Sequence, residues 1–100
     1  MTDLIFLLGA EVDIQSTDAR LEDFQEGWGL VFMQCLDAGL TLLRHHPQIG
    51  SAYEAPYRRL LIRRFPFGIF YEAQAERIVI AAVVDLRQSP DAIKRRLFGG

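Results

Sequence analysis

The sequence has very little cysteine: Cys35 is the only one in 100 residues. A single thiol forms no internal disulfide, so we expect a chain that works in the reducing cytoplasm. Long hydrophobic runs are also missing, because the longest uncharged apolar stretches, residues 4–10 and 78–84, fall far short of the ~20 residues that span a bilayer. Thr2 and Asp3 replace the basic start of a secretory signal peptide. We therefore expect a cytoplasmic protein with no membrane partner.

Basic residues are scarce in the first half of the chain and abundant in the second. Residues 1–50 carry two basic side chains against eight acidic ones, whereas residues 51–100 carry nine against five. The formal net charge of −2 hides this asymmetry, and a local field matters more for meeting a partner than the total charge does. The basic half is where we expect the binding surface.

The length and the 50% hydrophobic content fit a single domain, residues 1–100. In the first half, the apolar run Asp3–Leu8 predicts a buried strand, and apolar residues every three or four positions from Ala10 predict an amphipathic helix. Ser16 and Thr17 leave a broken helix open as an alternative. Gly27-Trp28-Gly29 predicts a turn rather than a phosphate-binding loop. The predicted core stripes of the two helices are Ala10, Ile14, Thr17, Leu21, Phe24 and Trp28, and then Gly29, Met33, Leu36, Leu40 and Leu43.

In the second half, β-branched and aromatic residues predict three further strands, Tyr57–Arg64, Phe67–Glu72 and Arg77–Leu86, joined by short loops. Ser89 and Pro90 begin a short helix, Pro90–Leu97. The predicted fold is α+β in the order β-α-α-β-β-β-α, with a helical hairpin packed on a mostly antiparallel four-stranded sheet.

Three stretches resemble the RelE/ParE superfamily, the toxins of bacterial type II toxin–antitoxin (plasmid stabilisation) modules. They are Gly29-Leu-Val-Phe32 opening a helix that runs into His46-Pro-Gln-Ile-Gly50, the segment Tyr57-Arg-Arg-Leu-Leu-Ile-Arg-Arg-Phe-Pro-Phe-Gly-Ile-Phe-Tyr71, and Ile78–Val84 followed by Asp85-Leu-Arg-Gln-Ser-Pro90. With the order of elements they cover Leu4–Leu97, and the middle stretch is the most specific. Family members commonly carry a histidine where Asp85 stands.

The resemblance implies one of two actions. RelE-like members are ribosome-dependent endoribonucleases that cut mRNA, which requires side chains that transfer protons. ParE-like members inhibit DNA gyrase. The tyrosine that nucleases carry after the last strand is replaced by Ile93, and no tyrosine or histidine follows Tyr71. We therefore expect a ParE-like toxin that binds its target, with no catalytic residues, metal or cofactor. The alternatives are a ribonuclease using Arg58, Arg63, Arg87 and Lys94 on the ribosome and mRNA, and a degenerate, non-toxic binding module.

The resemblance also implies a cognate, ParD-like antitoxin. Its acidic tail would wrap the hairpin and the basic sheet, and it would make most contacts with DNA. The candidate partner- or target-binding residues are all cationic: Arg58, Arg59, Arg63, Arg64, Arg87, Lys94 and Arg95. An alternative for Arg58 and Arg59 is an ion pair with Glu22 or Glu26 of the hairpin.

Four other groups of residues have simpler interpretations. His45 and His46 are adjacent on a helix, point about 100° apart and share no metal face. Cys35 is expected in the core. Tyr71, in the middle of a strand, is either a structural residue or a surface contact. The aromatic residues expected in the core are Phe65, Phe67 and Phe70.

Overall fold

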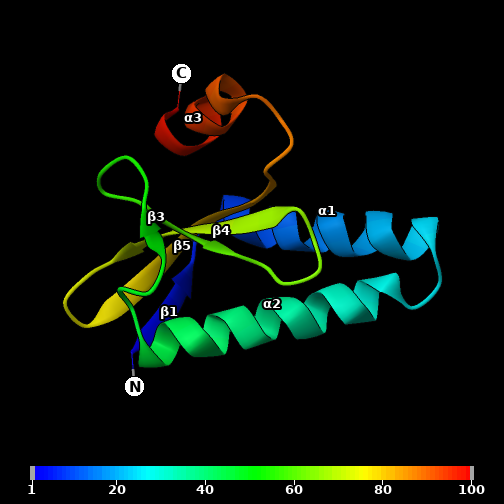
Figure 1. Ribbon diagram of the computed structural model, residues 1–100, viewed down its shortest axis with the longest axis horizontal. Helices are drawn as coiled ribbons and strands as arrows, with labels where there is room; N and C mark the ends of the chain where they lie inside the picture. The colour runs from blue at the N-terminus through cyan, green and yellow to red at the C-terminus, as the bar shows by residue number, and fades with distance from the viewer. Residues whose placement is uncertain (1, 100) are drawn as a thin grey trace.

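The computed structural model describes residues 2–99, and its elements follow the predicted order with one addition (Figure 1). They are β1 (Asp3–Phe6), α1 (Leu8–Phe24), α2 (Trp28–His45), β2 (Ser51–Ala52), β3 (Arg58–Leu61), β4 (Phe67–Ala73), β5 (Arg77–Asp85) and α3 (Pro90–Phe98). The α+β class and the helical hairpin are confirmed. Across residues 2–99, no helix has the length and apolar character that crossing a membrane requires. The predicted domain also included Met1 and Gly100, which lie outside the described residues.

Five strands form one sheet in the order β1-β5-β4-β3-β2. β1 pairs with β5 in parallel, and the other neighbours are antiparallel. The prediction of four strands was one short, because Ser51 and Ala52 form an edge strand against Arg59 and Arg58. Two small residues show no alternation of apolar and polar side chains, so the sequence pattern could not mark this strand.

Two strands are at least two residues shorter than predicted. β1 ends at Phe6, and α1 starts at Leu8 and continues without a break through Ser16 and Thr17. Of the predicted strand Tyr57–Arg64, only Arg58–Leu61 belongs to the sheet. Arg64 has a left-handed φ of 72°, which strand residues do not adopt. Arg63 and Arg64 therefore lie in the turn between β3 and β4.

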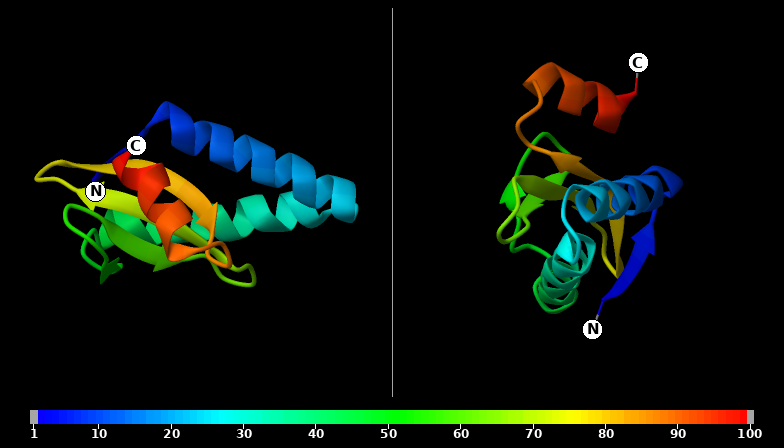
Figure 2. Two further views of the ribbon diagram at one scale, coloured as in Figure 1. Left: turned by 90° about the horizontal axis from the view of Figure 1, so that it is seen from above. Right: turned by 90° about the vertical axis from the view of Figure 1, so that its right-hand side faces the viewer.

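The sheet lies between two helical layers, with the α1–α2 hairpin on one face and α3 on the other (Figure 2). Side chains alternate between these faces along β4. Ile69 and Tyr71 join the hairpin core with Phe32, whereas Phe70 packs in a second cluster with Ile93 of α3. Of the predicted core aromatics, Phe67 and Phe70 are buried and Phe65 is partly buried against the hairpin core.

A β-bulge keeps β5 in contact with both layers. The register places Phe70 opposite Ala82 and Tyr71 opposite Ile80, so Ala81 is the extra residue. Ile80 and Val83 are three positions apart, which would place them on opposite faces of a regular strand. Because of the bulge, both of these side chains belong to the hairpin core.

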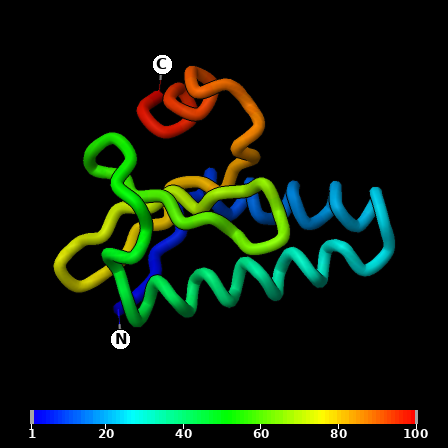
Figure 3. Tube along the Cα trace, in the orientation of Figure 1, coloured from blue at the N-terminus to red at the C-terminus, as the bar shows by residue number. Residues whose placement is uncertain are grey.

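The turn of the helical hairpin extends beyond the end of the sheet, as the Cα trace shows (Figure 3). Gly27 has a φ of 89°, and the Glu22 carboxylate accepts hydrogen bonds from the backbone N–H groups of Gly27 (3.0 Å) and Gly29 (3.1 Å). Because no strand lies beneath the turn, the side chain of Phe24 is 81% exposed. The predicted core position of Phe24 was wrong, and Phe32 is buried in α2 where Met33 was expected.

Candidate functional site

Arg58 has a structural contact within the chain. Its guanidinium donates hydrogen bonds to the carbonyl oxygens of Gly50 (2.8 Å) and Gln48 (3.3 Å). The alternative of an ion pair with Glu22 or Glu26 is wrong for Arg58, because its guanidinium binds these carbonyls and the Glu22 carboxylate accepts from the start of α2. Arg58 therefore holds the loop between α2 and β2 against the sheet.

Tyr71 lies beside this contact and is fully buried. Its hydroxyl donates to Pro47 O (2.8 Å) and accepts from Gly50 N–H (2.9 Å). Burial raises the pKa of Tyr71 above its ordinary value, against the smaller opposing effects of the Gly50 hydrogen bond and the Arg58 charge. The structural interpretation of Tyr71 is confirmed, and the surface-contact alternative is wrong.

Arg59 points to the opposite face of the sheet. It pairs with Phe70, whereas Arg58 pairs with Tyr71. Its Cγ lies 3.3 Å from the place that a β-carbon on Gly68 would occupy. The Nε of Arg59 is buried and has no hydrogen-bond partner among the described residues. The two neighbouring arginines thus belong to different surfaces.

Of the three C-terminal cations predicted to bind a partner, Arg87 and Lys94 are paired within the chain. Arg87 binds Asp85 at 2.8 Å, and Lys94 binds Glu54 at 3.1 Å. The hydrogen bond from Arg87 holds the pKa of Asp85 below its ordinary value, and the hydrogen bond to Glu54 raises the pKa of Lys94. A raised pKa makes Lys94 a poorer proton acceptor at neutral pH.

Most of the cations in the ribonuclease alternative make contacts within the chain. Of these four, only Arg63 makes no side-chain hydrogen bond or ion pair within the described chain, whereas Arg58, Arg87 and Lys94 each make one or more. Tyr57 donates its hydroxyl proton to Leu97 O (3.2 Å), and the ring of Tyr53 packs edge-on against Phe70. Residues 2–99 hold no group of three or more His, Cys, Asp or Glu side chains that could bind a metal ion.

An apolar groove runs between α2 and the edge of β3. It encloses a cavity of about 200 Å³, and we call it the edge groove. Its lining residues are Cys35, Ala38, Gly39, Leu42, Leu60, Leu61 and Arg63. Gly39 brings the helix close to the sheet, because a β-carbon there would lie 3.3 Å from Ile69 Cδ1. Cys35, predicted in the core, is only partly buried.

The backbone beside this groove is an open sheet edge. β2 pairs only with Arg58 and Arg59, so Leu60 and Leu61 have no strand on their outer side. The side chain of Leu61 is 59% exposed. Open edges with apolar side chains readily accept another strand. Sequence reasoning identified Arg63 here but missed Leu42 and Leu61. Their signal in the sequence was that each belongs to a pair of adjacent leucines, Leu42-Leu43 and Leu60-Leu61.

Comparison with known proteins identifies the fold. No protein-family model matches the chain, and no curated protein matches it either. A solved structure described as the chromosomal ParDE TA system from P. aeruginosa superposes with a TM-score of 0.75. The match covers 87% of this chain and 98% of that one, at 16% sequence identity. The chain therefore has a ParE-like fold, as the sequence motifs predicted.

Proposed function

We propose that this chain is the toxin of a type II toxin–antitoxin module, that it is ParE-like and acts by binding DNA gyrase, and that a cognate ParD-like antitoxin neutralises it. The fold likeness to a chain of a ParDE system supports the general class. Three of the four cations of the nuclease alternative, Arg58, Arg87 and Lys94, make contacts within the chain, which supports a binding role over a catalytic one.

The edge groove carries the proposal for the antitoxin. It combines an open strand edge at Leu60 and Leu61, an apolar floor, and Arg63 at its end. An extended tail with alternating apolar and acidic residues would add to the sheet, bury its apolar side chains in the groove and pair a carboxylate with Arg63. Contacts with operator DNA would then come mainly from the other half of the antitoxin.

Binding to gyrase is tested with purified components. The chain is added to DNA gyrase and relaxed plasmid, with and without the product of any small reading frame that adjoins its gene, taken as the candidate antitoxin. We expect loss of supercoiling with the chain alone and recovery when the neighbouring protein is present. Unchanged supercoiling at saturating chain would contradict the gyrase target.

Expression in bacteria separates the two alternatives. Cuts at codon positions in translated mRNA, mapped by primer extension, would favour the ribonuclease. Undisturbed growth after induction would favour a non-toxic binding module. Growth arrest with intact mRNA and altered plasmid topology is the result that the proposed function requires.

A further inference from the structure

The first strand forms a second open edge of the sheet. β1 is the outermost strand, and no described residue pairs with its outer side (Figure 2). Natural proteins protect such edges with lysine, proline or a β-bulge. β1 reads Asp-Leu-Ile-Phe, pairs with β5 in a regular register and is followed by Leu7. Apart from the charge of Asp3, this edge is apolar and open to another strand.

The backbone groups on the outer side of β1 belong to Leu4 and Phe6. The Leu7 N–H donates to Ile80 O (3.0 Å), so Leu7, and Ile5 two residues before it, direct their backbone groups at β5. Successive residues of a strand direct these groups to opposite sides. The N–H and C=O groups of Leu4 and Phe6 therefore point away from the sheet.

This spacing suits a second copy of the same strand. In an antiparallel pair of β1 strands centred on Ile5, Leu4 of one copy lies opposite Phe6 of the other. Each such pair can exchange two N–H···O hydrogen bonds. The two Ile5 side chains then face each other across the axis, and Ile5 is 43% exposed in the single chain. Cross-strand pairs of β-branched residues stabilise a sheet.

A groove separates this edge from α2, and we call it the β1 groove. It holds a cavity of about 320 Å³. Positions 37, 41 and 44 of α2 are four and three residues apart, so they form one row on the helix. The lining residues are Leu4, Phe6, Asp37, Leu40, Thr41 and Arg44.

The charges of the β1 groove are self-complementary. Asp37 and Arg44 are exposed, opposite in sign and at the two ends of the row. A two-fold interface sets a surface against its own copy turned end for end, so Asp37 of each chain would approach Arg44 of the other. A guanidinium has several N–H donors and can bind a partner's carboxylate beside a contact in its own chain. A partner with charge of a single sign would be repelled at one end.

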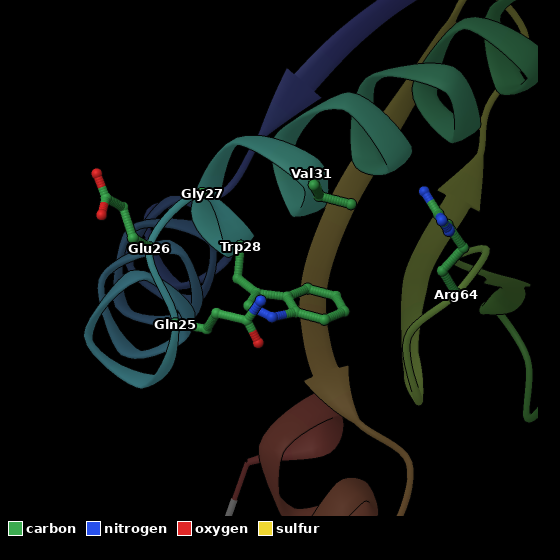
Figure 4. Close-up of a pocket in the computed structure, with 6 residues that line it drawn as sticks. All are labelled: Gln25, Glu26, Gly27, Trp28, Val31 and Arg64. Atoms are coloured by element: carbon green, nitrogen blue, oxygen red, sulfur yellow. The ribbon is translucent and has the colours of Figure 1, made fainter.

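The cavity at the turn of the helical hairpin lacks a strand edge. It holds about 230 Å³, and none of its lining residues belongs to a strand. Figure 4 shows the Glu26 side chain directed away from Trp28 and Arg64. Glu26 therefore offers a matched control for Asp37. The lining residues are Gln25, Glu26, Gly27, Trp28, Val31 and Arg64.

We infer that β1 and the β1 groove form a two-fold interface between two copies of this chain, which joins their sheets edge to edge. The edge groove lies at the other edge of the sheet and stays free in each copy. The inference rests on β1 and α2 alone and holds whether or not the chain is a toxin.

Analytical ultracentrifugation of the full chain tests the dimer and its charges. We expect a monomer–dimer equilibrium with a Kd on the order of 10 µM. Asp37→Arg should weaken it at least about tenfold, because like charges then face each other. Glu26→Arg makes the same change of charge at the hairpin turn and should leave the Kd unchanged. An equal mixture of Asp37→Arg and Arg44→Asp should form heterodimers, because each pair again unites opposite charges.

A cysteine at position 5 tests the register. Opposite residues of a non-hydrogen-bonded antiparallel pair have Cα atoms about 4.5 Å apart, within the range that a disulfide bridges. With Cys35→Ser in the background, Ile5→Cys should give a covalent dimer on a non-reducing gel after mild oxidation. Leu61→Cys in the same background places the thiol at the other edge and should stay monomeric.

Three results would overturn the inference. One is a chain that stays monomeric up to about 1 mM. Another is a dimer that Asp37→Arg and Glu26→Arg weaken equally. The third is oxidation that links Leu61→Cys as efficiently as Ile5→Cys, which would place the contact at the edge groove instead.

Discussion

Tyr71 shows how a single hydroxyl can order a loop. It connects the buried centre of β4 to Pro47 and Gly50, which follow the end of α2. Arg58 binds the Gly50 carbonyl from the adjacent strand. These bonds fix the short segment that leads into β2, and β2 covers the first half of the β3 edge.

Removing the hydroxyl should destabilise the protein. We expect Tyr71→Phe to lower the free energy of unfolding by about 1–3 kcal/mol, because a buried Gly50 N–H loses its acceptor. Tyr57→Phe is the control: its hydroxyl makes one bond, to Leu97 O in a half-buried position, and it should cost about 0.5–1.5 kcal/mol. Urea denaturation followed by circular dichroism measures both. Equal losses would contradict the role given to Tyr71.

Asp85 should make the free energy of unfolding depend on pH in the acidic range. Its pKa in the folded chain lies below the ordinary value of 3.8, chiefly because Arg87 hydrogen-bonds to the carboxylate. A lowered folded pKa means that this stabilisation is complete above the ordinary pKa and is lost as the pH falls through the folded value.

Asp85→Asn removes this dependence. As the pH falls below the ordinary pKa of 3.8, the free energy of unfolding of the natural chain should fall more steeply than that of the variant. Chemical denaturation at several pH values measures the two slopes. Parallel slopes would show that the Asp85–Arg87 contact contributes nothing to folding.

At the scale of elements, α3 is held by polar contacts in its second half as well as by Ile93. Arg96 binds Asp13 of α1 at 2.7 Å, and the same carboxylate oxygen accepts from Val83 N–H at 3.0 Å. β1 pairs with β5 only as far as Ile80, so Asp13 occupies the sheet edge where β1 has ended. One side chain thus connects α1, β5 and α3.

Arg96→Gln should loosen α3 without unfolding the domain. We expect the amides of residues 93–98 to exchange hydrogen about three to ten times faster, because the partly exposed ion pair between Arg96 and Asp13 is lost. Arg95→Gln is the matched control, since Arg95 is an exposed neighbour. Hydrogen exchange with mass spectrometry measures both. The prediction fails if the two variants behave alike or if exchange in α2 rises equally.

The periodic elements could be predicted from the sequence, and the contacts of individual charges could not. The apolar periods located both long helices and β4 and β5 to within a few residues. They could not show that Arg63 and Arg64 leave the strand, because Pro66 marks the connection but not the residue at which it begins. Nor could they show that α3 covers the far face of the sheet, since its amphipathic pattern fits either side.

The predicted binding residues divide for a physical reason. A guanidinium takes the nearest acceptor in the folded chain, and the sequence does not show which carbonyl or carboxylate that will be. Arg58 donates hydrogen bonds to two backbone carbonyls, and Arg87 forms an ion pair with Asp85, two positions earlier in the sequence. Arg63 and Arg64 lie in an exposed turn, where a partner's carboxylates can reach them.

At the scale of the whole molecule, one edge of the sheet is the proposed antitoxin site. We expect Leu61→Glu to weaken binding of the antitoxin's acidic tail at least about tenfold, because it places negative charge in an apolar groove. Ile5→Glu is the control, since Ile5 is 43% exposed on β1 at the opposite edge. Calorimetric titration of each variant measures the affinity. Equal weakening by the two variants would contradict an antitoxin site at the edge groove.

Pairing between β1 and β5 also sets when this protein can mature during synthesis. Asp3 pairs with Arg77, so β1 cannot join the sheet until β5, which begins more than seventy residues later, has been synthesised. Until that strand leaves the ribosome, the nascent chain exposes Leu4 and Phe6 and lacks the centre of its sheet. Any activity that needs the finished sheet therefore arises only after β5, and so most of the chain, has been made.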